Sequence, residues 1–221
     1  MVGFSKNVNR TYIRNSMKNI IFDLGNVLIA WDPNVIYKKY FAGDLAKMDR
    51  FYKETGIYKT NAELDRGRPF QEALTELSNK FPHYYEPIHF WKTKWLEMIG
   101  GSIEDSVKIL ESLYAQGYPL YALTNWAEET FFPHIRYNYE FFNYFKDIVV
   151  SGVESVIKPE LEIYKILLRR NNLNPEDCIF IDDNQDNLTP AKNLGMSVIK
   201  FTSPRQLKDQ LKFLGISVTI V

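Results

Sequence analysis

The chain has 221 residues, which suits one domain or one domain that carries a sizeable insertion. Hydrophobic residues make up 45% of the chain and charged residues 24%, a balance typical of a packed globular core. Lys and Arg together number 27, as do Asp and Glu, so the basic excess of nucleic-acid and membrane-surface binders is missing. No apolar run approaches the ~20 residues of a membrane span. The single cysteine, Cys178, excludes an internal disulfide, so we expect a cytoplasmic protein.

The first segment, residues 1–16, is polar and lacks the apolar middle region of a secretory signal. We expect it to be a disordered N-terminal extension, and Met17 offers an alternative start. The apolar run at 20–22 follows, and it ends in Asp23 and, two positions later, Gly25. A short apolar run bounded by a turn signal predicts a buried strand of a parallel sheet.

Asp23 then lies at the carboxyl end of the predicted strand, which is the edge of an open α/β sheet where ligands bind. A carboxylate held there by a rigid element can bind a hard cation or attack an electrophile. The plain alternative is an aspartate that only caps the turn after the strand.

Residues 33–100 predict a helical insertion. Apolar residues recur there at spacings of three and four, for example over 35–41 and 70–77, and no segment shows convincing strand alternation. A turn signal at 30–33 precedes the insertion. The sequence Ile-Gly-Gly-Ser at 99–102 ends it, and we interpret this segment as a glycine hinge.

After the insertion, strand and helix signals alternate along the chain. The predicted elements are a helix over 103–116, a strand over 119–123, helical pieces over 131–145 broken near Pro133, a strand over 147–150, a helix that Pro159 opens and that runs to 170, a strand over 178–181, a helix over 188–194, a strand over 197–201 and a helix over 204–214. This alternation predicts the α/β class, with a doubly wound parallel sheet. The core comprises residues 17–32 and 101–221, and residues 33–100 form a helical cap.

Polar groups stand where the predicted strands end, or soon after them. They are Asp23, Thr124 with Asn125, Asp182 with Asp183, and Lys158, which Pro159 keeps out of the following helix. Parallel strands bring all of these groups to one edge of the sheet. Two carboxylates from separate strands suit Mg²⁺, and the lysine and the Thr and Asn donors suit phosphate oxygens. This set supplies the positioning and charge compensation that phosphoryl transfer needs.

Four short motifs, in this order, carry a resemblance to a known family. They are Phe-Asp-Leu-Gly-Asn-Val at 22–27, Thr-Asn at 124–125, Lys-Pro-Glu at 158–160 and Asp-Asp-Asn-Gln-Asp-Asn at 182–187. With these motifs the chain resembles the haloacid dehalogenase-like (HAD) hydrolase superfamily over residues 18–214. It is most similar to the branch with a helical cap inserted after the first strand, and to a sugar-phosphate phosphatase subgroup. The resemblance implies a Rossmann-like core with an inserted α-helical cap.

The resemblance also implies a Mg²⁺-dependent phosphatase that hydrolyses a small phosphorylated metabolite through an aspartyl phosphate. The implied roles are Asp23 as nucleophile and Mg²⁺ ligand, the Gly25 backbone carbonyl as a further ligand, Thr124 and Lys158 as catalytic and phosphate-binding groups, Asn125 as a phosphate-binding residue, Asp183 as the second carboxylate ligand, and Asp182 and Asn187 as residues that hold a metal-bound water or the loop. We expect a monomer or a homodimer, with no nucleic-acid or membrane partner.

One departure from the family pattern concerns Gly25. Most phosphatases of the family carry an aspartate two residues after the nucleophile as general acid and base, a function typically worth ~10²–10⁴-fold in rate. With glycine there, turnover is slow, a water or another residue takes the role, or the substrate has a good leaving group, as in a sugar 1-phosphate. The gap also leaves open a non-catalytic protein that binds a phosphometabolite or a partner.

Two other activities stay open. A haloacid dehalogenase would use Asp23 without metal, but the pair Asp182-Asp183 argues against it, because two adjacent acids repel each other unless a cation offsets them. A phosphomutase would also need the acid and base that Gly25 replaces.

Other side chains receive weaker interpretations. Arg66 and Arg68 lie in the cap, where a solvated turn is favoured over a contact with phosphate. Trp31 and Trp126 closely follow motif segments, and packing against the cap is favoured over stacking on a sugar ring. Cys178 at the start of a strand is expected to be inert core.

Overall fold

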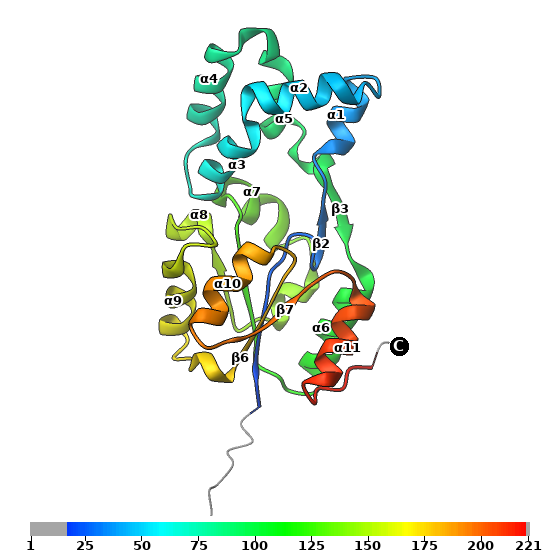
Figure 1. Cartoon of the computed structure of the whole chain (residues 1–221), viewed down its shortest axis with the longest axis vertical. Coiled ribbons are helices and arrows are strands. Elements are labelled where there is room, and N and C mark those ends of the chain that lie inside the picture. Colours follow the sequence, from blue (N-terminus) through cyan, green and yellow to red (C-terminus); the bar gives the residue numbers. More distant parts are fainter. Residues whose placement is uncertain (1–16, 220–221) are drawn as a thin grey trace, which may run out of the picture.

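The computed structural model describes residues 17–219 (Figure 1). The expectation of a disordered extension over residues 1–16 lies outside the described residues. No helix within 17–219 is long and apolar enough to cross a membrane.

A five-stranded sheet forms the centre of the core. Its strands are β1 (Asn19–Phe22), β4 (Leu120–Thr124), β5 (Asp147–Val150), β6 (Cys178–Asp182) and β7 (Ser197–Lys200). The spatial order is β5-β4-β1-β6-β7, and every neighbouring pair is parallel. All residues of β4 and β6 are buried, because helices cover both faces of the sheet. The predicted α/β class with a doubly wound parallel sheet is confirmed.

Four helices cover the two faces. They are α6 (Glu104–Ala115), α9 (Leu161–Arg170), α10 (Gln185–Asn193) and α11 (Pro204–Phe213). Ile21 packs in one apolar cluster with residues of α9 and α10, while Ile20 and Phe22 pack in another with residues of α6 and α11. This split follows from the strand geometry, because successive side chains point to opposite faces. In Figure 1, α9 and α10 lie to the left of the sheet, and α6 and α11 lie to the right.

A two-stranded antiparallel ribbon connects the core to the inserted helices. Its strands are β2 (Ile29–Trp31) and β3 (Ile99–Ser102). The segment at 99–102 that the sequence interprets as a glycine hinge is strand β3 of this ribbon, and its role as a hinge stays a prediction. The turn predicted at 30–33 is confined to the two residues between β2 and α1. A β-carbon on Gly100 would lie 3.1 Å from Cβ of Ala30, so glycine at this position permits the close approach of the two strands.

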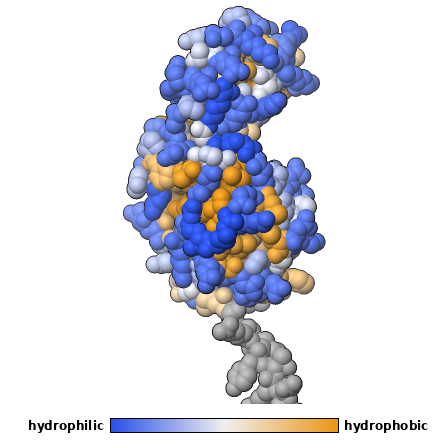
Figure 2. Space-filling model, turned by 90° about the vertical axis from the view of Figure 1, so that its left-hand side faces the viewer, coloured by the Kyte–Doolittle hydropathy of each residue, from blue (hydrophilic) through white to orange (hydrophobic). Residues whose placement is uncertain are grey.

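The insertion between β2 and β3 is helical, as the apolar spacing predicts. Its elements are α1 (Asn34–Tyr40), α2 (Leu45–Thr55), α3 (Ile57–Asp65), α4 (Phe70–Lys80), η1 (Pro82–Tyr84), α5 (Tyr85–Thr93) and η2 (Trp95–Met98). Aromatic rings of Tyr37, Phe51 and Trp91 pack at its centre. Figure 2 shows this helical part as a mostly hydrophilic lobe joined to the core through a narrower waist. The division into a cap of residues 33–100 and a core of 17–32 and 101–221 stays a prediction.

The remaining short helices differ in detail from the prediction. The aromatic stretch is helical in pieces, namely α7 (Glu128–Phe131), η3 (Phe132–Arg136) and η4 (Glu140–Tyr144), and α8 (Ser151–Glu154) and η5 (Pro175–Asp177) are further short elements. Pro159 does not open α9, because a turn closed by the Glu160 N–H and the Ile157 carbonyl at 2.9 Å separates it from the helix. The Lys158–Pro159 peptide bond is cis. Helix α10 begins before residue 188, because the Asn184 side chain caps its N-terminus.

Candidate active site

The parallel register brings the ends of β1, β4 and β6 to one edge of the sheet. Strand β1 pairs with β4 on one side and with β6 on the other. Asp23 directly follows β1, Thr124 is the last residue of β4, and Asp182 is the last residue of β6. All three are buried. The groups that the sequence places at strand ends therefore meet at a single edge.

Lys158 joins two of these strand ends. Its Nζ lies 2.8 Å from Oδ1 of Asp23 and 2.7 Å from Oδ2 of Asp182, and it donates to the carbonyl of Leu123 at 3.0 Å. The lysine side chain is only 1% exposed. Because three acceptors surround the buried ammonium, its position is fixed. The Asn125 side chain adds two hydrogen bonds to the main chain of Lys158.

Asp182 is held by the protein itself. The Asn187 amide donates to both of its carboxylate oxygens at 3.0 Å, and the Asn184 N–H donates to Oδ1 at 2.7 Å. The Tyr164 hydroxyl donates to the Asn187 carbonyl at 2.7 Å and so steadies the helix that carries Asn187. With Lys158 on its second oxygen, Asp182 acts as an anchor for Lys158 and for the loop after β6.

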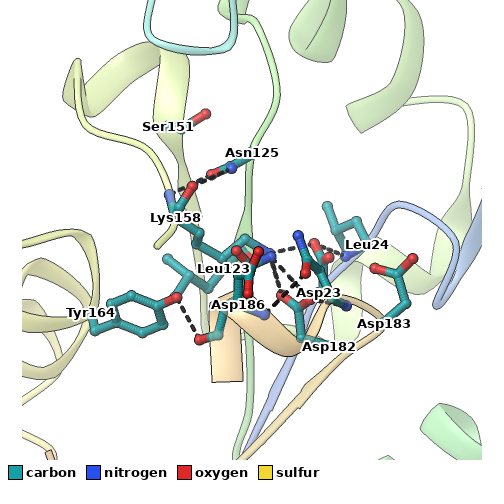
Figure 3. Close-up of polar contacts among 12 residues, drawn as sticks. Asp23, Leu24, Leu123, Asn125, Ser151, Lys158, Tyr164, Asp182, Asp183 and Asp186 are labelled. Atoms are coloured by element: carbon teal, nitrogen blue, oxygen red, sulfur yellow. Dashed lines mark hydrogen bonds and ion pairs between the residues drawn. The ribbon is translucent and has the colours of Figure 1, made fainter. Parts of the chain in front are cut away.

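Three carboxylates gather where a cation can bind. Oxygens of Asp23, Asp182 and Asp183 all lie within 4.8 Å of one another. In Figure 3, Lys158 approaches Asp23 from one side and Asp183 lies on the other. Hard oxygen donors of this kind suit Mg²⁺. Because Asp182 is engaged by Lys158 and Asn187, the carboxylates best able to hold an ion are Asp23 and Asp183.

Asp23 has one oxygen bound and one that can react. Its Oδ1 accepts hydrogen bonds from the Leu24 N–H at 2.7 Å and from Lys158. Among the contacts of the described residues, both of these use Oδ1, so Oδ2 keeps its lone pairs for a cation or an electrophile.

The electrostatics of the cluster favour a bound cation. Burial raises the pKa of Asp23 to about 8, while the Lys158 ammonium lowers this pKa and the Asp182 carboxylate raises it. Burial also raises the pKa of Asp183, and Asp182 adds to that shift. Acidic groups that are hard to ionise in a dry cluster ionise readily beside a divalent cation. The residues present therefore fit a hard metal ion.

A cavity of about 90 Å³ opens beside Gly25. It is lined by Gly25, Trp31, Asn61, Asp65, Phe70, Trp95, Asn125, Trp126, Ala127 and Thr130. A β-carbon placed on Gly25 would meet no atom within 4 Å, so the missing side chain leaves open space at this point. The indole Nε1 of Trp126 is buried and has no hydrogen-bond partner among the described residues. An unpartnered buried donor in a cavity wall suits a ligand that carries an acceptor.

The inserted helices contribute a residue that sequence reasoning missed. Asp65 ends α3 and lines the cavity together with Gly25. Its main-chain carbonyl accepts a hydrogen bond from the Ser151 hydroxyl at 2.5 Å, which ties α3 to the core. The available signal in the sequence is an acid immediately before Arg66, one of the two cap arginines considered for a contact with phosphate.

The two arginines of the cap, Arg66 and Arg68, both form ion pairs with glutamates. Arg66 forms an ion pair with Glu160 of the core. Arg68 contacts three glutamates of the cap, Glu63, Glu72 and Glu76. Neither arginine lines the cavity.

The two tryptophans pack as the sequence suggests. Trp31 packs edge-on against Trp91, and Trp126 against Trp95, and each also lines the cavity. Burial raises the pKa of the Cys178 thiol to about 11, in keeping with inert core.

The chain is similar in sequence to two phosphatases and in structure to a solved HAD-family enzyme. The chain is 24% identical to a sesquiterpene phosphatase of Aspergillus oryzae over 190 residues, 85% of this chain and 91% of that protein. It is 24% identical to the D-ribitol-5-phosphate phosphatase of Bacteroides thetaiotaomicron over 201 residues, 83% of this chain and 91% of that protein. A HAD-family enzyme of Bacteroides thetaiotaomicron, crystallised with magnesium and inorganic phosphate, matches with a TM-score of 0.64 at 20% identity, over 85% of this chain and 95% of that chain.

The family model of the haloacid dehalogenase-like hydrolases matches residues 17–195, from before β1 to beyond the end of α10. This match covers the four motifs at 22–27, 124–125, 158–160 and 182–187. The helical-cap branch and the sugar-phosphate subgroup stay predictions. The chain belongs to the haloacid dehalogenase-like hydrolase family.

Proposed function

We propose that this hydrolase is a Mg²⁺-dependent phosphatase that cleaves a small phosphate monoester of the sugar-phosphate class through an aspartyl phosphate on Asp23. The observation that carries the proposal is the position of the Asp23 carboxylate. It touches the Lys158 ammonium at 2.8 Å and lies in one cluster with Asp183. A nucleophile, a phosphate-neutralising cation and a metal-binding acid thus share one site.

Mg²⁺ would be held by Asp23, Asp183 and the Gly25 carbonyl, and when bound it neutralises charge on the phosphoryl group. Of the adjacent aspartates Asp182 and Asp183, Asp182 would serve the structure, because it keeps Lys158 in place. Two curated relatives are phosphatases by name, and one structural neighbour was crystallised with magnesium and phosphate. These likenesses support the same chemistry here.

The reaction has two halves. Oδ2 of Asp23 attacks phosphorus, the bond from phosphorus to the leaving oxygen breaks, and an aspartyl phosphate forms. Lys158 neutralises the phosphoryl oxygens, and the Thr124 hydroxyl at the end of β4 hydrogen-bonds them. Water then attacks phosphorus, the bond to Asp23 breaks, and inorganic phosphate leaves. The Asp23 carboxylate is restored.

The cavity indicates the class of substrate. Asn61, Asp65 and the unpartnered indole N–H of Trp126 give its wall polar groups between aromatic rings. A small hydroxylated leaving group offers an acceptor to the indole N–H of Trp126, whereas a long prenyl chain leaves this N–H unpaired. We therefore favour sugar and polyol phosphates over terpenyl phosphates.

Cellular context follows from the sequence. We place the enzyme in the cytoplasm, because a single cysteine fits a reducing compartment. It acts on a small phosphorylated metabolite as a monomer or a homodimer.

The test is phosphate release from a panel of sugar and polyol phosphates, with farnesyl phosphate as the apolar comparison, in Mg²⁺ and in EDTA. We expect release that requires Mg²⁺ and is lost in Asp23→Asn. Halide release from 2-chloropropionate in EDTA would instead identify a dehalogenase. Phosphate binding without turnover of any ester would identify a non-catalytic binding protein.

A further inference from the structure

The open space beside Gly25 poses a chemical problem for the proposed reaction. The leaving oxygen of an alkyl phosphate needs a proton as its bond to phosphorus breaks. Gly25 carries no side chain that holds a proton, and a β-carbon there would have no neighbour within 4 Å. The same cavity, however, is lined by a second acidic residue of the chain, Asp65.

The segment that carries Asp65 is fixed against the core by several contacts. Ser151 donates to the Asp65 carbonyl at 2.5 Å, and the Phe70 N–H donates to Oε1 of Glu129 at 3.0 Å. Arg66 adds its ion pair with Glu160. Because these contacts reach three separate core segments, the Asp65 side chain is positioned at the cavity rather than free to swing.

A glycine pair permits this close docking. A β-carbon on Gly67 would lie 2.7 Å from the carbonyl oxygen of Gly152, so only glycine lets the turn after α3 approach the core. Gly67 also has a φ of +96°, a conformation that favours glycine. The approach of cap to core that brings Asp65 to the cavity is therefore built into the sequence.

The Asp65 carboxyl is suited to carry a proton. Burial raises the pKa of Asp65 to about 7. Hydrogen bonds from the Ala127 main chain and the Asn61 amide, which donates to Oδ2 at 2.9 Å, lower this pKa, and so does the Lys158 ammonium. Lys158 is the charged group that acts on Asp65. A general acid works best with a pKa near the operating pH, which is the case here.

We propose that Asp65 is the general acid that protonates the leaving oxygen, in place of the aspartate missing at Gly25. This inference rests on the proposed phosphatase function. As Asp23 attacks, the phosphorus–oxygen bond breaks, its electron pair goes to the leaving oxygen, and the Asp65 proton moves to that oxygen. The free alcohol and the Asp65 carboxylate result.

The second half of the reaction is the same for every ester and does not need Asp65. Water attacks the aspartyl phosphate, the bond from phosphorus to Asp23 breaks, and inorganic phosphate leaves with the protons of that water. Asp65 regains its proton from solvent before the next cycle. The unpartnered indole N–H of Trp126 donates to a hydroxyl of the leaving group and so holds it beside Asp65.

The test compares two esters with different leaving groups in the full-length enzyme. Acetyl phosphate releases acetate, which needs no proton, and the alkyl ester is the sugar or polyol phosphate that the wild type cleaves fastest. In Asp65→Asn, kcat for the alkyl ester should fall about 10²–10⁴-fold, while kcat for acetyl phosphate stays within about threefold. The matched control is Asp49→Asn, an exposed acid of α2 that pairs with Lys53, and it should change neither value.

A rescue variant separates proton donation from cap docking. A side chain on Gly25 meets open space, so Gly25→Asp in the Asp65→Asn background should restore turnover of the alkyl ester at least tenfold (~1.4 kcal/mol).

The wild-type pH profile is a test that needs no variant. Because the acid must be protonated, kcat for the alkyl ester should fall as pH rises above about 7, and kcat for acetyl phosphate should not fall there.

The outcomes distinguish the two proposals. An equal loss of both activities in Asp65→Asn, no loss of either, or the same pH profile for both esters would overturn the role of Asp65 and leave the phosphatase intact. A wild type that cleaves acetyl phosphate but no alkyl ester would do the same. A wild type that cleaves neither ester in Mg²⁺ would overturn the phosphatase and Asp65 together.

Discussion

Asn125 and Lys158 are joined by two hydrogen bonds between a side chain and a main chain. Oδ1 of Asn125 accepts from the Lys158 N–H at 2.7 Å, and its Nδ2 donates to the Lys158 carbonyl at 2.9 Å. An amide supplies both the donor and the acceptor that this arrangement needs. The Lys158 ammonium contacts Asp23 at the other end of the same residue. Asn125 therefore holds Lys158 through the Lys158 main chain. Because this uses the Asn125 side-chain amide, the Asn125 main chain is the part that could contact a phosphate.

The first prediction concerns this amide. Asn125→Ala removes both hydrogen bonds, which should lower the free energy of unfolding by about 1–3 kcal/mol and reduce kcat several-fold as Lys158 loses its position. Urea unfolding and phosphate release measure the two effects. Asn138→Ala is the control, since the Asn138 amide makes its hydrogen bond within an exposed turn. A stability loss with unchanged kcat would show that Asn125 serves only the fold.

The second prediction concerns the ammonium itself. Lys158→Met leaves the buried carboxylates of Asp23 and Asp182 without the cation that lies between them. Removal of one partner from a buried ion pair typically costs about 3–5 kcal/mol, so the metal-free variant should lose stability of this order above about pH 8, where Asp23 is ionised. The loss should shrink at low pH, because protonated carboxyl groups need no counter-charge.

A double variant checks the origin of that loss. Asp23→Asn together with Lys158→Met removes a charge of each sign, so it should be more stable than Lys158→Met alone in urea unfolding. Equal stability of the single and double variants would show that the ion pair with Asp23 contributes nothing to the fold.

Much of the site could be predicted because the signals are local. Apolar runs that end in polar groups indicate where β1, β4 and β6 end. Because the strands of a parallel sheet all end at one carboxyl edge, Asp23, Thr124 and Asp182 are expected to meet there. Lys158 was found from Pro159, which follows it directly. The sequence also predicts different roles for Asp182 and Asp183, and these roles stay a prediction. The hydrogen bonds from Asn187 to Asp182 fit the holding role that is predicted for Asp182.

The unpredicted features depend on contacts between distant segments. Gly100 and Gly101 have no side chains to show strand alternation, so the ribbon of β2 and β3 had no sequence signal. Asp65 meets Ser151 across 86 positions of the chain, and nothing near Asp65 in the sequence reveals that meeting. The cavity that Asp65 lines has walls from both the inserted helices and the core, so it forms only once the cap rests on the core.

The third prediction concerns the docking of the cap. Gly67→Ala adds a β-carbon 2.7 Å from the Gly152 carbonyl oxygen at a φ of +96°. Strain of this kind costs of order 1–3 kcal/mol, and the displaced turn should move Asp65 away from the cavity and lower kcat for alkyl esters. Thermal unfolding and phosphate release measure the outcome.

A second glycine of the cap serves as the control. Gly43 has a φ of +79°, but a β-carbon there meets nothing within 4 Å. Gly43→Ala therefore carries the backbone strain without the contact with the core, and it should lower stability while kcat stays near the wild-type value. If both variants lose kcat equally, the contact of Gly67 with Gly152 does not position the site.

The last prediction concerns Mg²⁺ and pH. Burial raises the pKa of Asp23 from its ordinary 3.8 to about 8 and raises that of Asp183 as well. A carboxyl group with a pKa raised by folding stabilises the fold below its unfolded pKa, and this contribution is lost as pH rises through the folded pKa. The metal-free protein should therefore lose stability between about pH 4 and about pH 8.

A cation between the two carboxylates offsets this loss, because it stabilises their ionised forms. The rise in Tm on replacing EDTA with Mg²⁺ should thus be larger at about pH 8 than at about pH 5, where protons compete with the ion. Asp183→Asn should abolish the rise, while Asp105→Asn, an exposed acid of α6 near Lys108, should leave it unchanged. A rise of the same size in Asp183→Asn would place the stabilising ion somewhere other than between Asp23 and Asp183.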